Sequence, residues 1–165
     1  MTAHFSFAEF TNSDTATRLG VDNTPSPGTT RRILDLMEKM EVVRGILKTP
    51  ISINSGYRSE PLEKVLCDKD YRAWCKRHGY IVDKNSWDLY FVGKAHPIGY
   101  ACDFTSPTFG TPSQIVTHLQ RELLRFDQLI CEGSWVHISF DPKMRGQVLN
   151  ATFVDGTPSY TVRTA

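Results

Sequence analysis

The segment "EGSWVHISF" (residues 132–140) decides how this chain folds around its most informative side chains. Apolar and polar positions alternate along it, as they do in a strand with one buried face. Val136, Ile138 and Phe140 then pack inward, which leaves His137 on the opposite face. We therefore expect His137 to face a cleft or solvent, not the core.

A second segment, "KAHPIGYACDF" (residues 94–104), brings two more polar side chains to the same region. Strand alternation in "YACDF" turns Asp103 to the face opposite Cys102, so the cysteine is a poor ligand candidate. His96 precedes a proline in a loop, and Gly99 lets the backbone turn so that loop and strand converge. We expect His96 and Asp103 to approach each other.

Two imidazoles and one carboxylate are a ligand set typical of zinc. His96, Asp103 and His137 would supply three protein ligands and leave a fourth position for water, as in catalytic zinc sites. Zinc lowers the pKa of its bound water to around 7. The alternative is that these are ordinary polar surface residues, which is the commoner situation for such spacings.

A hydrolytic site of this kind also needs a base and a cation for the developing oxyanion. Glu132 ends the strand "FDQLICE" on the same face as Gln128, and the Gly133–Ser134 turn can fold it back beside His137. Arg58 lies in the loop "SGYRS", where a guanidinium can hold a carbonyl oxygen or a carboxylate in fixed geometry.

The remaining pattern predicts an α+β fold, a single domain with a small central antiparallel sheet flanked by helices. We divide it into a helical N-terminal part (1–50), a metal-site core (51–140) and a polar C-terminal tail (141–165). The predicted helices lie in 5–10, 13–19, 30–47, 61–78 and from 111 onward. The predicted strands are "ISIN", "DLYFV", "YACDF", "FDQLICE" and "WVHISF".

Composition excludes several classes of protein. The formal net charge is +1, so nothing favours nucleic acid or an anionic membrane as a partner. The N-terminal residues lack the features of a signal peptide, and no apolar run reaches the ~20 residues that a membrane helix needs. We expect a monomer whose four cysteines are reduced thiols.

Three motifs, "SGYRS", "HPIGYACDF" and "WVHIS", in this order, resemble those of the zinc D-Ala-D-Ala carboxypeptidase family, which cleaves bacterial cell-wall peptides. This family shares a superfamily with lysostaphin and the Hedgehog signalling domain. The opening "FSFAEFTNSDTATRLGVDNTPSP" is similar to the phage-type branch. The resemblance therefore covers nearly the whole chain.

The resemblance implies one Zn²⁺ per chain, with His96, Asp103 and His137 as ligands, and Arg58 as the substrate-binding, transition-state-stabilising arginine. Many relatives place the catalytic acid three residues before the last histidine, where this chain has Ser134. The phage-type pattern instead matches Glu132, to which we assign the base, with Asp127 as the reserve.

The chain departs from the family pattern in two places. Lys94 stands where relatives often have serine, two residues before the first histidine ligand. The stretch 60–94 is longer than in compact members, and we expect it to wall one side of the cleft. Cys67, Cys75 and His78 suggest a second metal site, but their place on an aromatic helical stripe favours packing.

The expected function is hydrolysis of peptidoglycan stem peptides or cross-links by a phage endolysin, held in the host cytoplasm until lysis. Two alternatives remain open: a bacterial wall-remodelling D,D-carboxypeptidase, and a non-catalytic zinc-containing binding module of the same fold. The family includes D,D-carboxypeptidases, D,D-endopeptidases and L-alanyl-D-glutamate endopeptidases, so the bond that is cut stays open.

Overall fold

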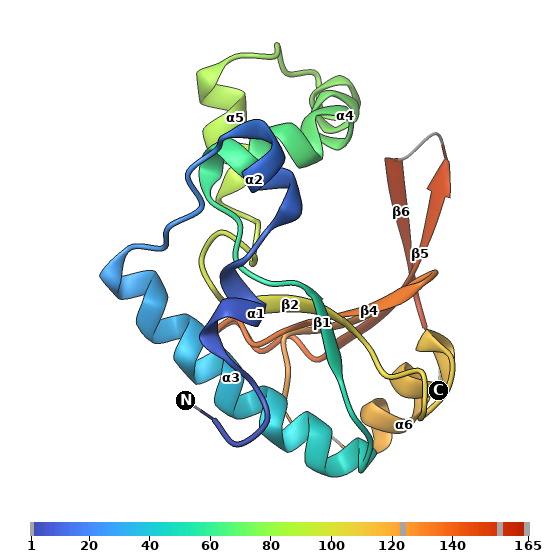
Figure 1. Ribbon diagram of the computed structural model, residues 1–165. Helices are drawn as coiled ribbons and strands as arrows, with labels where there is room; N and C mark the ends of the chain where they lie inside the picture. Colours follow the sequence, from blue (N-terminus) through green and yellow to red (C-terminus); the bar gives the residue numbers. More distant parts are fainter. Residues whose placement is uncertain (1, 123–124, 155–156, 164–165) are drawn as a thin grey trace.

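A computed structural model describes residues 2–122, 125–154 and 157–163, and its fold is α+β (Figure 1). The helices are α1 (Phe7–Thr11), α2 (Asp14–Leu19), α3 (Pro27–Leu47), α4 (Glu60–His78), α5 (Lys84–Phe91) and α6 (Pro112–Glu122). The strands are β1 (Ser52–Ser55), β2 (Ala101–Thr105), β3 (Gln128–Glu132), β4 (Trp135–Ser139), β5 (Gln147–Val154) and β6 (Thr157–Val162). Among the described residues, no helix is long and apolar enough to cross a membrane.

The six strands form one open sheet in the order β1-β2-β4-β3-β5-β6. Four neighbouring pairs are antiparallel, and the β3–β5 pair is parallel. The predicted antiparallel sheet is thus found for four of the pairs, and the β3–β5 pair makes the sheet mixed. After β4 the chain passes to the far side of β3, so β5 runs in the same direction as β3 and opposite to β4.

The main core lies between one face of the sheet and helices α3 and α6 (Figure 1). The helix predicted over 30–47 is confirmed as α3, which begins earlier, at Pro27, with Ser26 as its cap. The helix is amphipathic, and its apolar stripe is buried at every position: Ile33, Leu36, Met37, Met40, Val43 and Leu47.

Strand alternation was predicted correctly on β2 and β4. Cys102, Val136 and Ile138 are fully buried in the core against the helices. Asp103 and His137 belong to the other face, where they line a cleft. The sheet thus separates an apolar layer from a polar one, and this separation positions the site.

The segment "DLYFV" (88–92) is not the strand that we expected. It lies at the end of α5, which Asp83 caps by accepting a hydrogen bond from the backbone N–H of Ser86. Trp87 and Tyr90 pack against α4 in a second, aromatic cluster. A short apolar run fits a strand or a buried helix equally well, and contacts with α4 decide for the helix.

The expectation of a polar tail over 141–165 also needs correction, because this region contains β5 and β6. Only the first part of β5 is buried, through Val148 and Leu149. The rest forms a hairpin that projects beyond the other strands (Figure 1). Both faces of this hairpin are largely exposed, so its sequence lacks the apolar–polar alternation by which a half-buried strand is recognised.

Candidate metal centre and its cleft

The three candidate ligands come from two neighbouring strands and one loop. Asp103 on β2 and His137 on β4 are direct partners in the antiparallel register, so the sheet itself brings their side chains together. His96 reaches them from the loop before β2. That loop turns at Gly99, whose φ of 86° is the left-handed conformation expected there.

The donor atoms form a small triangle. His96 Nε2 lies 3.2 Å from His137 Nδ1 and 3.3 Å from Asp103 Oδ1, and His137 Nδ1 lies 2.9 Å from Asp103 Oδ1. Ligands 2.0–2.2 Å from a tetrahedral zinc ion are about 3.3–3.6 Å apart. The triangle is therefore close to the size that zinc requires, and small adjustments fit the ion.

Burial and hydrogen bonding prepare these groups for a metal. The Nδ1 atom of His96 lies 2.7 Å from the carbonyl oxygen of Gly56, which accepts its proton and leaves Nε2 as a lone-pair donor. Burial, and the nearby charge of Arg58, lower the pKa of His96 and favour neutral imidazole. Although burial disfavours ionised Asp103, the adjacent imidazoles hold its pKa well below its usual range.

Arg58 contacts the metal-binding group directly. Its Nη2 donates to Asp103 Oδ2 at 2.8 Å, its Nε donates to Ser55 Oγ at 3.1 Å, and its Nη1 lies 3.6 Å from Glu63 Oε2. Burial opposes the charged guanidinium, but Asp103 and Glu63 raise the pKa of Arg58 above its ordinary value. These contacts hold the planar guanidinium of Arg58 in one orientation beside the candidate ligands. Its role in binding substrate stays a prediction.

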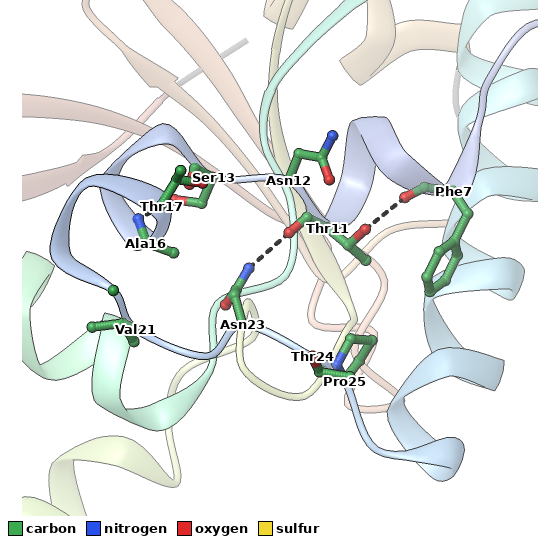
Figure 2. A pocket seen from close by; sticks show the side chains of 11 residues that line it. Phe7, Thr11, Asn12, Ser13, Ala16, Thr17, Val21, Asn23, Thr24 and Pro25 are labelled. Carbon is green, nitrogen blue, oxygen red and sulfur yellow. Dashed lines mark hydrogen bonds between the residues drawn. The ribbon is translucent and has the colours of Figure 1, made fainter.

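The loop that carries Arg58 is fixed by the N-terminal segment. Asn23 donates to the carbonyl oxygens of Thr11 and Tyr57, and its side-chain oxygen accepts from the N–H of Ser59. Asn23 also lines a cavity of about 450 Å³, and Figure 2 shows its side chain beside Thr11, whose carbonyl oxygen accepts its hydrogen bond. These hydrogen bonds tie the N-terminal segment to the loop that carries Arg58.

The candidate ligands lie in a cleft of about 890 Å³. One wall consists of α4 and the loop 93–95, which confirms that the stretch 60–94 borders the cleft. The β5–β6 hairpin forms the other wall, which is mainly apolar. The residues of this second wall are Leu149, Phe153, Pro158 and Tyr160.

Glu132 lines the cleft, on the same face of β3 as Gln128 and Ile130, as alternation predicted. Its Oε2 accepts a hydrogen bond of 2.9 Å from the indole N–H of Trp135, a contact that sequence reasoning missed. Ser134 is exposed in the turn. The assignment of Glu132 as the base stays a prediction.

Asp127, the reserve candidate for the base, does not line the cleft. Its side chain is buried, and its two oxygens accept hydrogen bonds of 2.8 and 2.6 Å from the guanidinium of Arg145. Burial disfavours the carboxylate, but these bonds lower the pKa of Asp127. Asp127 therefore has a structural environment, paired with Arg145 away from the cleft.

Glu63 is a cleft residue that sequence reasoning did not select. It is 1% exposed on α4, lies beside Arg58, and accepts a hydrogen bond from the Cys67 thiol. Its Oε2 has no hydrogen-bond partner within the described part of the chain. The spacing of Glu63, Cys67 and Asp70 places them on one face of α4, but it does not show that this face lies beside Arg58.

The suggested second metal site does not form. Among the described residues, the one group that brings three potential ligands together is His96, Asp103 and His137. Cys75 is buried in the aromatic cluster, whereas the ring of His78 lies against the Trp74 carbonyl. All four cysteines are free thiols, and burial raises the pKa of Cys67 to about 12.

The fold and the site together define a class: an α+β protein with a buried His–Asp–His group at the base of a cleft, the donor set of a mononuclear zinc hydrolase. Residues 3–65 match the family model described as Peptidase M15, and the match supports the zinc D-Ala-D-Ala carboxypeptidase family indicated by the motifs. No curated protein matched the chain. The matched segment includes Arg58 but ends before the metal-binding candidates, whose grouping depends on the geometry described above.

Proposed function

We propose that this protein is a zinc peptidase that hydrolyses peptide bonds in the stem peptides or cross-links of bacterial peptidoglycan, and that it acts as a phage endolysin. The observation that carries the proposal is the His96–Asp103–His137 group at the base of a cleft that also contains Arg58 and Glu132. The Peptidase M15 match supports the same chemistry at the level of the family.

The chain's own residues have distinct tasks in this reaction. A zinc ion held by the three ligands would supply Lewis-acid activation of water and of the scissile carbonyl group. Glu132 takes the proton of the attacking water, and its hydrogen bond from Trp135 orients the carboxylate toward the cleft. Arg58 presents a fixed fork that holds substrate oxygen and stabilises developing negative charge.

The shape of the cleft suits a short peptide. Its volume of about 890 Å³ is within the usual range of 300–1,000 Å³ for small-molecule sites. The α4 wall supplies charged groups, and the hairpin wall supplies apolar surface against which a peptide can lie. Substrate affinity therefore comes from the cleft itself.

Two other functions remain as alternatives. A bacterial wall-remodelling D,D-carboxypeptidase would use the same centre. A non-catalytic binding module has no need for a carboxylate and a guanidinium beside the metal. The presence of Glu132 and Arg58 in the cleft therefore favours the enzyme.

Digestion of purified peptidoglycan tests the proposal. Mass spectrometry of the released muropeptides, after incubation with zinc-loaded protein, is expected to show new fragments, and their masses identify the bond. His137→Ala protein serves as the control and should release none. Absence of new fragments with fully zinc-loaded protein would contradict the proposed activity and favour the binding module.

A further inference from the structure

The charged wall of the cleft contains an ion pair that the proposed chemistry does not use. Lys94 Nζ lies 3.2 Å from Asp70 Oδ2, and both side chains are partly exposed to the cleft, at 27% and 22%. Lys94 is two residues before His96, and both members of the pair line the cleft that contains the candidate metal centre.

Tyr90 contacts both members of the pair. Its hydroxyl donates a hydrogen bond to Asp70 Oδ2, and the Lys94 ammonium lies 4.1 Å from the centre of its ring. Burial and the bond to Asp70 raise the pKa of Tyr90, which therefore stays a hydrogen-bond donor. The two charges are held in place by a buried aromatic side chain, unlike the exposed pairs elsewhere on α4 and α5.

A partly buried ion pair favours some ligands over others. A ligand that carries an ammonium and a carboxylate on one carbon can exchange partners with both residues, so that Asp70 binds its ammonium and Lys94 binds its carboxylate. No charge is then left unpaired. A ligand with an ammonium alone must compete with Lys94 for Asp70 and is repelled by the lysine.

We propose that Asp70 and Lys94 form a subsite for a side chain that ends in an α-amino-acid group. This inference rests on the proposed function and narrows its substrate class. Peptidoglycan stem peptides contain a diamino acid whose side chain ends either in an ammonium alone, as in lysine, or in an ammonium and a carboxylate, as in meso-diaminopimelate. The subsite selects the diaminopimelate type.

Calorimetric titration of the zinc-loaded Glu132→Gln protein tests the subsite apart from turnover. The two probes are L-alanyl-γ-D-glutamyl-meso-diaminopimelate and the same tripeptide ending in L-lysine. We expect the diaminopimelate peptide to bind about tenfold more tightly, the scale of one partly exposed charged hydrogen bond. Equal affinities, tighter binding of the lysine peptide, or binding of neither would overturn the inference.

Substitutions in the same protein identify the residues responsible. Lys94→Gln leaves the Asp70 carboxylate without its lysine, so the preference should shift toward the lysine peptide. Asp70→Asn combined with Lys94→Gln should remove most of the difference. The matched control, Lys84→Gln with Asp88→Asn, neutralises an exposed pair on α5 and should keep the tenfold preference. A preference that survives in the Asp70–Lys94 double variant contradicts the assignment.

The failure of this inference differs from the failure of the proposed function. If the wild-type protein releases muropeptides but binds the two tripeptides equally, the peptidase activity stands and the subsite does not. If it releases none, the proposed function fails, while a diaminopimelate preference that depends on Lys94 still supports the subsite in a binding module.

Discussion

At the residue scale, the Arg58 guanidinium is held in one orientation by contacts of its three nitrogen atoms. Each edge of its guanidinium faces a different partner: Ser55, Asp103 and Glu63. Lysine keeps the charge at this position but cannot reproduce three directions. The guanidinium geometry, and not the charge alone, is therefore what we expect activity to require.

Arg58→Lys should retain zinc and lose turnover. Removing one preorganised donor at a developing oxyanion costs about 10²–10³-fold in rate, and we expect a loss of that size on peptidoglycan. The measurement is muropeptide release together with zinc content by elemental analysis. Arg121→Lys, on the exposed side of α6, is the control. Full activity in Arg58→Lys would show that the fork plays no part.

Glu132→Gln tests the base. A general base contributes about 10²–10⁴-fold, so turnover should fall by that factor while zinc content and thermal unfolding stay unchanged. Asp127→Asn is the comparison variant, because Asp127 is paired with Arg145 away from the cleft. If Asp127→Asn abolished cleavage per folded molecule and Glu132→Gln did not, the base assignment would be wrong.

At the element scale, α1 contacts the loop that follows β1, and this loop holds His96 of the candidate metal centre. Tyr57 donates its backbone N–H to the carbonyl oxygen of Phe10 at 2.7 Å, and the Gly56 carbonyl accepts from His96. A Cβ atom added at Gly56 would lie 2.3 Å from the Phe10 oxygen and 2.8 Å from its Cα. These are backbone atoms, so the two elements would have to separate.

We therefore predict that Gly56→Ala destabilises the fold by about 3 kcal/mol, the upper end of the usual overpacking cost, and weakens zinc binding through His96. Urea unfolding and zinc titration measure the two effects. Gly45→Ala is the control, because its Cβ meets nothing within 4 Å on an exposed turn of α3. That change should raise stability by up to about 1 kcal/mol. Equal stabilities for the two variants would refute the close contact.

The Asp127–Arg145 pair connects the start of β3 to the segment before β5 and predicts a pH dependence. The pKa of Asp127 is lower in the folded than in the unfolded protein. Its ionisation therefore stabilises the fold fully above the unfolded pKa of ~3.9, and this stabilisation disappears as pH falls toward the folded pKa. Asp127→Asn should lower the free energy of unfolding by about 1–3 kcal/mol at pH 7. Urea unfolding should show that difference shrinking at pH 3, and a difference independent of pH would contradict it.

Sequence patterns predicted the elements whose two faces differ. In β2 and β4, one face is apolar and the other carries Asp103 and His137, so alternation gave the correct orientation. Helix α5 and the β5–β6 hairpin were not predicted, because a short apolar run fits a strand or a buried helix equally well and because the exposed hairpin shows little alternation. Glu63 was missed because its burial beside Arg58 depends on how α4 packs, which spacing alone does not show.

At the scale of the whole molecule, the two faces of the sheet have different roles. The face toward α3 and α6 carries the main core, and the opposite face carries the polar group beneath the cleft. The walls of the cleft, α4 and the β5–β6 hairpin, lie outside the residues that hold the candidate metal. Changes in these walls can alter substrate choice while the centre stays the same.

The central claim is that one zinc ion is held by His96, Asp103 and His137. Elemental analysis of purified protein, after zinc loading and removal of free metal, tests it most directly. We predict one zinc per chain in the wild type, close to none in His137→Ala, and full occupancy in His4→Ala, where an exposed histidine contacts Glu41. A His137→Ala protein that is folded and still carries one zinc per chain would contradict the account.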